Sequence, residues 1–161
     1  MTIKIAVVNE SLNNETRVAL VPEIAQKLAS NNVSFIIEKN AGESSGFLDS
    51  AYPENACKFV SSSADALKDA DVLFKVNPPT SDEIEKMKRG SLAISYMNPF
   101  QNDTLIKQMA SSGVDAFSVE LIPRISRAQS MDALSSQASI AGYKAVVLAA
   151  NHANKFFPML T

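Results

Sequence analysis

The feature that most constrains the fold is a regular alternation of two hydrophobic patterns along the chain. Short stretches rich in β-branched and aromatic residues, typical of strands, lie at residues 3–8, 33–38, 71–76, 92–97 and 116–121. Stretches with helical spacing lie between them, at residues 22–29, 62–68, 81–88 and 102–111. Strands that alternate with helices favour a parallel sheet covered on both faces. We therefore predict a three-layer, doubly wound α/β fold with a mostly parallel sheet, flavodoxin-like or Rossmann-like.

A longer helical pattern begins at Leu134 and predicts a long C-terminal helix. Ser130 or Asp132 is expected to cap its first turn, because a side-chain oxygen there accepts from the free N–H groups at a helix start. We expect an α/β domain over residues 1–130, followed by the helix over 131–161. One helix face is predicted to carry Leu134, Ala138, Ala141, Ala145, Leu148, His152 and Phe156.

Composition excludes several classes of function. The net charge of -2 and the lack of a basic run argue against nucleic acid as a partner. Cys57 and His152 are the single cysteine and histidine, so an internal disulfide is excluded and no four-ligand Cys/His metal site is expected. The apolar run at residues 3–8 is far shorter than a membrane span, so we expect no direct membrane insertion of this segment.

A polar loop, residues 123–136, leads into the long helix and has two interpretations. Arg124 and Asp132 either form an ion pair that braces the loop, with Gln129 bonded to nearby backbone, or they belong to a cradle for an amide. In the second case Gln129 offers a donor and an acceptor that match the carboxamide of a nicotinamide ring. Hydride transfer needs positioning groups more than a general base, so no catalytic side chain is expected.

The loop also carries a resemblance to a known family. Residues 123–137, with Ala141-Gly142-Tyr143-Lys144-Ala145, closely resemble the NAD(H)-binding alpha subunit of proton-translocating NAD(P) transhydrogenases, which share a superfamily with alanine dehydrogenases. The resemblance implies that the nicotinamide end of NAD(H) is contacted by Arg124, Gln129, Asp132 and Ser135.

The same resemblance implies a reaction and partners. Hydride would pass between NADH at this subunit and NADP+ on a partner beta subunit, coupled to proton movement through a separate membrane portion. It further implies a homodimer and a location at the cytoplasmic face of the inner membrane, held there by partner subunits. The family continues past this length into a Rossmann domain, whose glycine fingerprint the five glycines here do not form. We therefore expect a chain that ends at a domain junction, in the apolar residues 155–161, and that is inactive alone.

Two cations define a second candidate site. Arg17 lies in residues 15–20, which are similar to the N-terminal signature of the superfamily, and Lys75 ends the expected strand 71–76. From the residues alone, Arg17 is expected to pair with a nearby glutamate, and Lys75 is either buried beside an anion or exposed. In alanine dehydrogenases the matching arginine holds the substrate carboxylate and the matching lysine joins it at the substrate. The resemblance therefore makes Arg17 and Lys75 a candidate anion or substrate pocket.

One departure from the superfamily separates its two activities. Alanine dehydrogenases place a catalytic histidine after the strand that matches 92–97, whereas this chain has Tyr96 and Asn98. Without a histidine, proton transfer to a 2-oxo acid loses its usual agent. The alternatives to a transhydrogenase subunit are an alanine dehydrogenase-like oxidoreductase and a non-catalytic protein-binding module that docks through Phe156 and Phe157.

Overall fold

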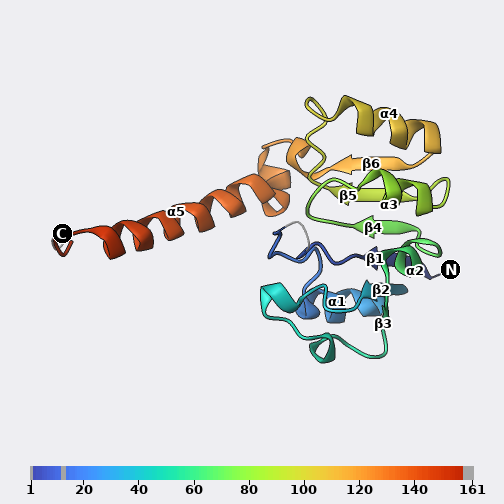
Figure 1. Ribbon diagram of the computed structural model, residues 1–161, viewed down its shortest axis with the longest axis horizontal. Coiled ribbons are helices and arrows are strands. Elements are labelled where there is room, and N and C mark those ends of the chain that lie inside the picture. The colour runs from blue at the N-terminus through green and yellow to red at the C-terminus, as the bar shows by residue number, and fades with distance from the viewer. Residues whose placement is uncertain (1, 12–13, 158–161) are drawn as a thin grey trace. The chain divides into compact units, whose positions relative to one another are not determined.

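A computed structural model describes residues 2–11 and 14–157, with only the backbone described at Ser30. Within these residues, six parallel strands form one sheet in the order β3-β2-β1-β4-β5-β6 (Figure 1). The prediction of a doubly wound α/β fold is confirmed. The strands are β1 (Ile3–Val7), β2 (Val33–Glu38), β3 (Cys57–Val60), β4 (Val72–Phe74), β5 (Leu92–Ser95) and β6 (Asp115–Ser118).

The strand order places a topological switch point at the centre of the sheet. The chain runs outward from β1 in one direction and from β4 in the other, so the loops after these neighbouring strands diverge. In open α/β sheets, ligands bind in the crevice at such a point, outside the carboxyl ends of the strands. The α-helices are α1 (Pro22–Leu28), α2 (Ser63–Leu67), α3 (Ser81–Lys86), α4 (Asp103–Ser112) and α5 (Ala133–His152).

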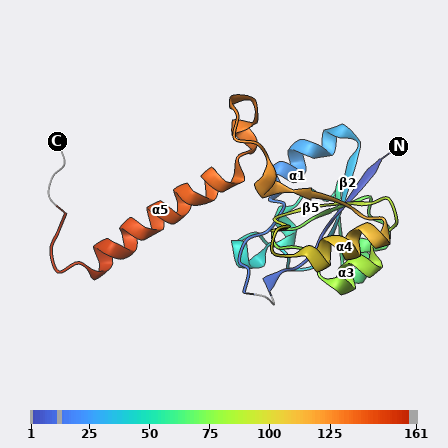
Figure 2. The same ribbon diagram turned by 90° about the horizontal axis from the view of Figure 1, so that it is seen from above.

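Alternation along β1 divides the core between the two faces of the sheet. Ile5 and Val7 pack in a cluster with Ala25 of α1, because successive strand residues point to opposite faces. Ala6 and Val8 pack in the other cluster, which α2, α3 and α4 supply. Figure 2 shows α1 on one side of the sheet and α3 and α4 on the other. Both faces of the central strand are therefore buried, as a parallel sheet requires.

Local hydrogen bonds explain where several helices begin and end. Thr80 and Glu83 form a capping box at the start of α3, since each side chain bonds the backbone N–H of the other residue. Asp132 caps α5 by accepting from the N–H of Ser135, so of the two predicted caps Asp132 is the one found. Gly113 ends α4 at φ +70°, in the left-handed region that glycine adopts at low cost.

Some local structure differs from the prediction. The strand β3 was missed, and the polar loop includes a turn of 3-10 helix at Ser126–Met131. The helix predicted over 81–88 is shorter, because α3 stops at Lys86. Further 3-10 turns within the described residues are Ala29–Asn31, Glu43–Ser45, Asp49–Ala51 and Val119–Leu121.

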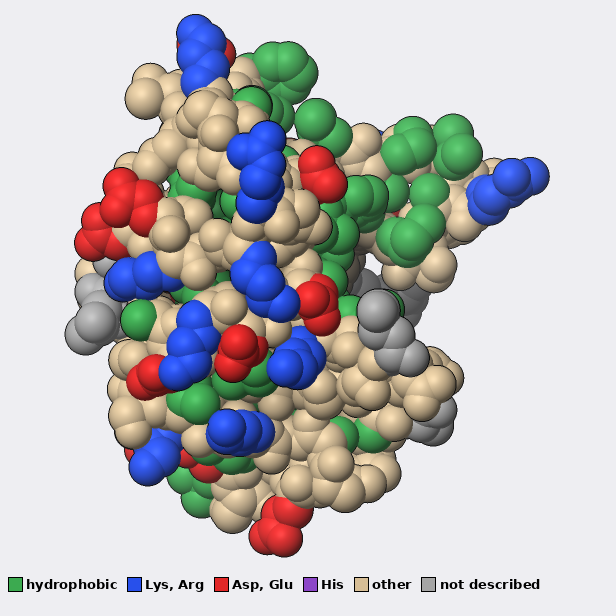
Figure 3. Space-filling model, turned by 90° about the vertical axis from the view of Figure 1, so that its right-hand side faces the viewer, with side chains coloured by type: hydrophobic (Ala, Val, Ile, Leu, Met, Phe, Trp, Pro, Cys, Tyr) green, Lys and Arg blue, Asp and Glu red, His purple; other side chains and the backbone are tan. Residues whose placement is uncertain are grey.

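The amino ends of the strands form a face on which charges of both signs are interspersed (Figure 3). Asp71, just before β4, accepts from the backbone N–H of Lys4 and pairs with the Lys88 ammonium at 3.0 Å. These bonds, the one from the backbone of Lys4 first, lower the pKa of the Asp71 carboxyl. Asp71 therefore links the start of β1 to the Lys88 side chain.

The chain divides into two compact units, residues 1–119 and 120–161. The second unit contains the polar loop together with α5. None of the helices in the described part of the chain is long and apolar enough to span a membrane. Along α5 the exposed apolar side chains include Ile140, Tyr143 and Val146, which lie outside the predicted apolar face. Residues 158–161 of the apolar end lie outside the described residues.

Strand β4 supplies a test of the core. Leu73 of β4 is fully buried, so Leu73→Ala should lower the free energy of unfolding by about 2–5 kcal/mol through lost burial and a residual cavity. Leu48 is exposed, and Leu48→Ala should change it by less than about 0.5 kcal/mol. Urea unfolding measures both values. Equal effects of the two substitutions would contradict the position of β4 at the centre of the core.

Candidate functional site

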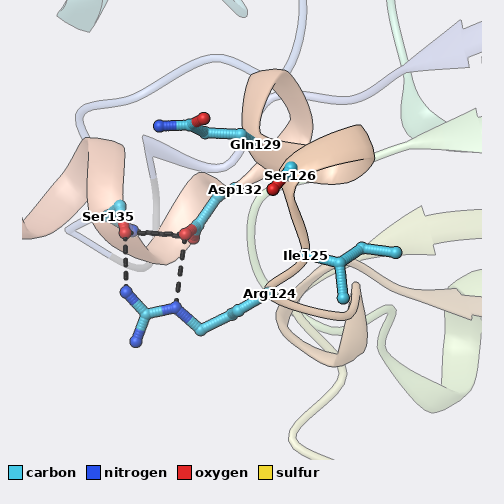
Figure 4. Close-up of a pocket in the computed structure, with 6 residues that line it drawn as sticks. All are labelled: Arg124, Ile125, Ser126, Gln129, Asp132 and Ser135. Carbon is cyan, nitrogen blue, oxygen red and sulfur yellow. Dashed lines mark hydrogen bonds and ion pairs between the residues drawn. The ribbon is translucent and has the colours of Figure 1, made fainter.

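A pocket of about 340 Å³ lies where the polar loop enters α5 (Figure 4). All of its lining comes from the second unit, over one short stretch of sequence. The loop contributes the first side chains, the 3-10 turn Ser126–Met131 the next, and the start of α5 the last. The lining residues are Arg124, Ile125, Ser126, Gln129, Asp132 and Ser135.

Three of these side chains form one hydrogen-bonded group. The Ser135 hydroxyl donates to Asp132 Oδ2 at 2.6 Å, and the Ser135 N–H donates to Asp132 Oδ1 at 2.9 Å. Arg124 Nη2 donates to Ser135 Oγ at 3.0 Å, and Arg124 Nε lies 3.3 Å from Asp132 Oδ2. The Arg124 side chain is still 71% exposed, so much of its fork faces outward. The group therefore fixes a guanidinium at the mouth of the pocket.

Asp132 is the acceptor on which this group depends. The Ser135 hydroxyl, then the Ser135 backbone N–H and the Arg124 guanidinium, hold the pKa of the Asp132 carboxyl below its ordinary value. The carboxylate therefore stays ionised at neutral pH. An ionised Asp132 accepts hydrogen bonds and has no proton to give, which makes it an orienting group in this pocket.

Gln129 differs from its neighbours because its carboxamide is not engaged. Among the described residues, the structure shows no hydrogen bond to its side-chain oxygen or nitrogen. Figure 4 shows the amide projecting from the 3-10 turn, apart from the Arg124–Asp132–Ser135 group. The predicted ion pair between Arg124 and Asp132 is present, but the bond from Gln129 to nearby backbone is not found. The pocket therefore presents a donor and an acceptor side by side.

The second pair of candidate residues is engaged within the chain. Arg17 Nε and Nη2 donate to the two oxygens of Glu15, each at 2.8 Å, and the Arg17 guanidinium lies 6.0 Å from the Tyr96 ring centre. The hydrogen bond from Arg17, partly offset by burial, lowers the pKa of Glu15 to about 2. Arg17 was expected to pair with a nearby glutamate, and Glu15 is that glutamate.

Lys75 is buried beside an anion, which was one of its two predicted states. Its side chain is 3% exposed, and its ammonium donates to Glu83 Oε2 at 2.8 Å and to the Pro78 carbonyl at 3.3 Å. Glu83 is the capping-box residue of α3, so one carboxylate serves both the helix start and the lysine. Glu83 was not predicted as the partner of Lys75, although the Thr80-x-x-Glu83 spacing marks its position at a helix start.

The loop after β1 is tied to the loop after β4 through carboxylates. Glu10, buried, accepts from the backbone N–H groups of Val76 and Asn77 at 2.7 and 2.9 Å. The Asn77 amide also donates to Glu15 Oε2 at 3.2 Å. Asn77 was not among the predicted site residues, and no local pattern marks it. At the switch point, carboxylates of the chain itself therefore accept from backbone N–H groups at the end of β4, from Lys75 and from Arg17.

The ion pair of Arg17 with Glu15 predicts a specific pH dependence. Because the pKa of Glu15 is about 2 in the fold and 4.5 ordinarily, the pair stabilises the fold above pH 4.5 and is lost as pH falls toward 2. The free energy of unfolding of Glu15→Gln should therefore decline less over this range than that of the parent chain. Substitution of the exposed Glu54, Glu54→Gln, is the control. If the free energy of unfolding declined equally in Glu15→Gln and in the parent chain over this range, the ion pair would not stabilise the fold.

Comparisons with known proteins agree with the geometry of the fold. The family model described as "Alanine dehydrogenase/PNT, N-terminal domain" matches residues 6–141. A transhydrogenase structure from Sinorhizobium meliloti superposes with a TM-score of 0.89 at 41% identity, over 98% of this chain and 47% of that one.

The similar proteins include both transhydrogenase subunits and alanine dehydrogenases. NAD(P) transhydrogenase subunit alpha of Haemophilus influenzae is 40% identical over 95% of this chain and 30% of its own length. Alanine dehydrogenase 1 of Staphylococcus aureus is 30% identical over 91% of this chain and 38% of its own length. The chain thus spans less than half the length of these relatives. By its sequence and its fold, the chain belongs to the alanine dehydrogenase and transhydrogenase N-terminal domain family, on the side of the transhydrogenase alpha subunits.

Proposed function

We propose that this chain supplies the nicotinamide-positioning region of a proton-translocating NAD(P) transhydrogenase. In that enzyme, hydride passes between NADH at this subunit and NADP+ on a partner beta subunit, coupled to proton movement through a membrane portion. The observation that carries the proposal is that an open Gln129 carboxamide and a fixed Arg124 guanidinium line one pocket. Such a donor and acceptor pair complements the carboxamide of nicotinamide.

Each residue of the pocket has a positioning role in this proposal. Gln129 pairs with the carboxamide of the nicotinamide, and the exposed part of the Arg124 guanidinium donates to the oxygen of that carboxamide. Asp132 and Ser135 hold that fork in place through the bonds at 2.6 to 3.3 Å. Bound NADH supplies the hydride itself. No side chain takes a proton in this step, so the pocket accelerates it by orientation.

The remainder of the enzyme supplies what this chain lacks. None of its five glycines forms the fingerprint that holds a dinucleotide pyrophosphate, so we propose that other parts of the enzyme anchor the phosphates. The alpha subunit relatives are longer than this chain, which supports that division. We propose a homodimer at the cytoplasmic face of the inner membrane, attached through the beta subunit and the membrane portion. By itself the chain should be inactive.

The alanine dehydrogenase-like function has less support. A substrate carboxylate at Arg17 and Lys75 would have to displace Glu15 and Glu83, each 2.8 Å from its cation. Asn98 also stands where those enzymes have their histidine, and its amide donates to Gln101. We propose instead that Arg17 and Lys75 brace the loops at the switch point.

A titration with reduced nicotinamide mononucleotide tests the pocket. In two-dimensional NMR spectra of this chain, the side-chain amide of Gln129 should shift, and Gln129→Ala should weaken the shifts of the rest of the loop. Binding should be weak, because most contacts to a dinucleotide are missing. Gln26→Ala, an exposed glutamine of α1, is the control. Shifts confined to the surroundings of Arg17 and Lys75 would contradict the assignment, and pyruvate is the matching probe for that second site.

The complete enzyme tests the positioning role. Asp132→Asn should lower the rate of NADP+ reduction by NADH about 10²-fold, because a ring displaced by about 1 Å reacts poorly. Asp65 has a similar bond to the hydroxyl of Ser62, at 2.8 Å at the start of α2, so Asp65→Asn is the matched control and should leave the rate unaltered. An unaltered rate in Asp132→Asn would remove the Arg124–Asp132–Ser135 group from the mechanism.

A further inference from the structure

Strand β6 ends the sheet on one side, and its outer edge is open (Figure 1). The Asp115 N–H donates to the Ser91 carbonyl beside β5, so by alternation the backbone groups of Asp115 and Phe117 face β5. Those of Ala116 and Ser118 face outward, away from the sheet. Within the described residues, no backbone hydrogen bond from a loop or turn reaches these outward groups. The edge therefore presents two N–H groups and two carbonyls to another chain.

The residues of β6 do not shield this edge. Native edge strands are commonly protected by lysine or proline, which disfavour pairing with another strand. The strand at the opposite edge, β3, carries the exposed Lys58, whereas β6 reads Asp-Ala-Phe-Ser. Ala116 is exposed, Phe117 is 47% exposed, and the buried Ser118 hydroxyl has no hydrogen-bond partner within the described residues. β6 is therefore an edge suited to the addition of a strand.

The strand is self-complementary about Phe117. When a second β6 lies antiparallel with the two-fold axis at Phe117, Ala116 of each copy is opposite Ser118 of the other. Residues opposite each other in this way exchange both of their N–H···O bonds, so every outward group of β6 is paired. The two Phe117 residues then form a pair without hydrogen bonds, in which side chains lie closest. A register centred on Ala116 would instead place Ser118 opposite Val114, outside the strand.

We propose that the β6 edge binds a second copy of this chain by antiparallel strand pairing centred on Phe117, so that two sheets become one. The proposed function includes a homodimer but leaves its surface open, and this inference assigns that surface. It does not depend on nicotinamide binding, because β6 belongs to the first unit, residues 1–119, and none of its residues lines the candidate pocket.

Charge and area agree with a second copy as the occupant. Each Asp115 lies opposite Val119 of the other copy, so like charges do not face one another, and the two Asp115 residues are about 14 Å apart along the strands. Phe117 lies beside the half-buried Ile94 on the same face of the sheet, which adds apolar area near the axis. A strand of four residues buries less than the roughly 1,200–2,000 Å² of a standard interface. The dimer is therefore weak and depends on concentration.

Sedimentation velocity of this chain over about 10 μM to 1 mM measures the dimer. Phe117→Lys should raise the dissociation constant about tenfold or more, because two ammonium groups replace the aromatic pair at the axis. Ala116→Pro should do the same, since proline is tolerated where an edge N–H faces outward but cannot donate to the second copy. Leu48→Lys introduces the same charge at another exposed apolar site and should have no effect. A chain that stays monomeric, or a dimer that resists both substitutions, would overturn the proposal.

Amide hydrogen exchange identifies the edge itself. The N–H groups of Ala116 and Ser118 should become protected as the concentration of the chain rises, whereas those of Asp115 and Phe117 should be protected throughout by their bonds to β5. A dimer without this gain in protection would be formed by another surface, which contradicts the proposal. In the complete alpha subunit, protection of Ala116 and Ser118 at every concentration would mean that another strand of that subunit occupies the edge, and this would also overturn it.

A titration with reduced nicotinamide mononucleotide separates this inference from the proposed function. Phe117→Lys should bind the nucleotide as the parent chain does, because Phe117 lies outside the pocket. Weaker binding by this variant would show that the substitution disturbs more than the edge, and would contradict the assignment. A parent chain that dimerises through β6 but does not bind the nucleotide would contradict the proposed function and support the β6 pairing.

Discussion

The carboxylate of Asp132 is the group on which the candidate site depends. It accepts from the backbone and the hydroxyl of Ser135, which fixes the start of α5, and it pairs with Arg124, which fixes the loop. A capping bond of this kind stabilises a helix start, and here it also sets the direction of a guanidinium. Helix formation and site geometry therefore share one side chain, and a substitution that removes the cap also disturbs the pocket.

The first unit uses buried carboxylates in a similar way. Glu10 bonds the backbone at the end of β4, and Glu83 serves both α3 and Lys75. Each carboxylate is buried and accepts hydrogen bonds there. Without such partners, a buried charge would be costly. The consequence for function is that the carboxyl edge of the sheet is braced at the switch point. An open donor and acceptor pair is found instead at Gln129, in the second unit.

The sequence predicted the layers of the fold better than its local turns. The strand 33–38 matches β2 residue for residue, because it is rich in β-branched and aromatic side chains. The strand β3 was missed, since it has four residues and pairs with one neighbour, so little hydrophobic pattern marks it. At the site, residue types suggested the Arg124 to Asp132 pair, but they left open whether Gln129 binds backbone. The pairing of Lys75 with Glu83 depends on the packing of α3 beside β4, which no local pattern encodes.

A crystal structure of the complete alpha subunit with bound NADH would show directly where the nicotinamide binds. We expect the nicotinamide carboxamide to be hydrogen-bonded to the Gln129 side chain, with Arg124 still held by Asp132 and Ser135. A nicotinamide ring located elsewhere, for example beside Arg17 and Lys75 with Glu15 displaced, would contradict this expectation.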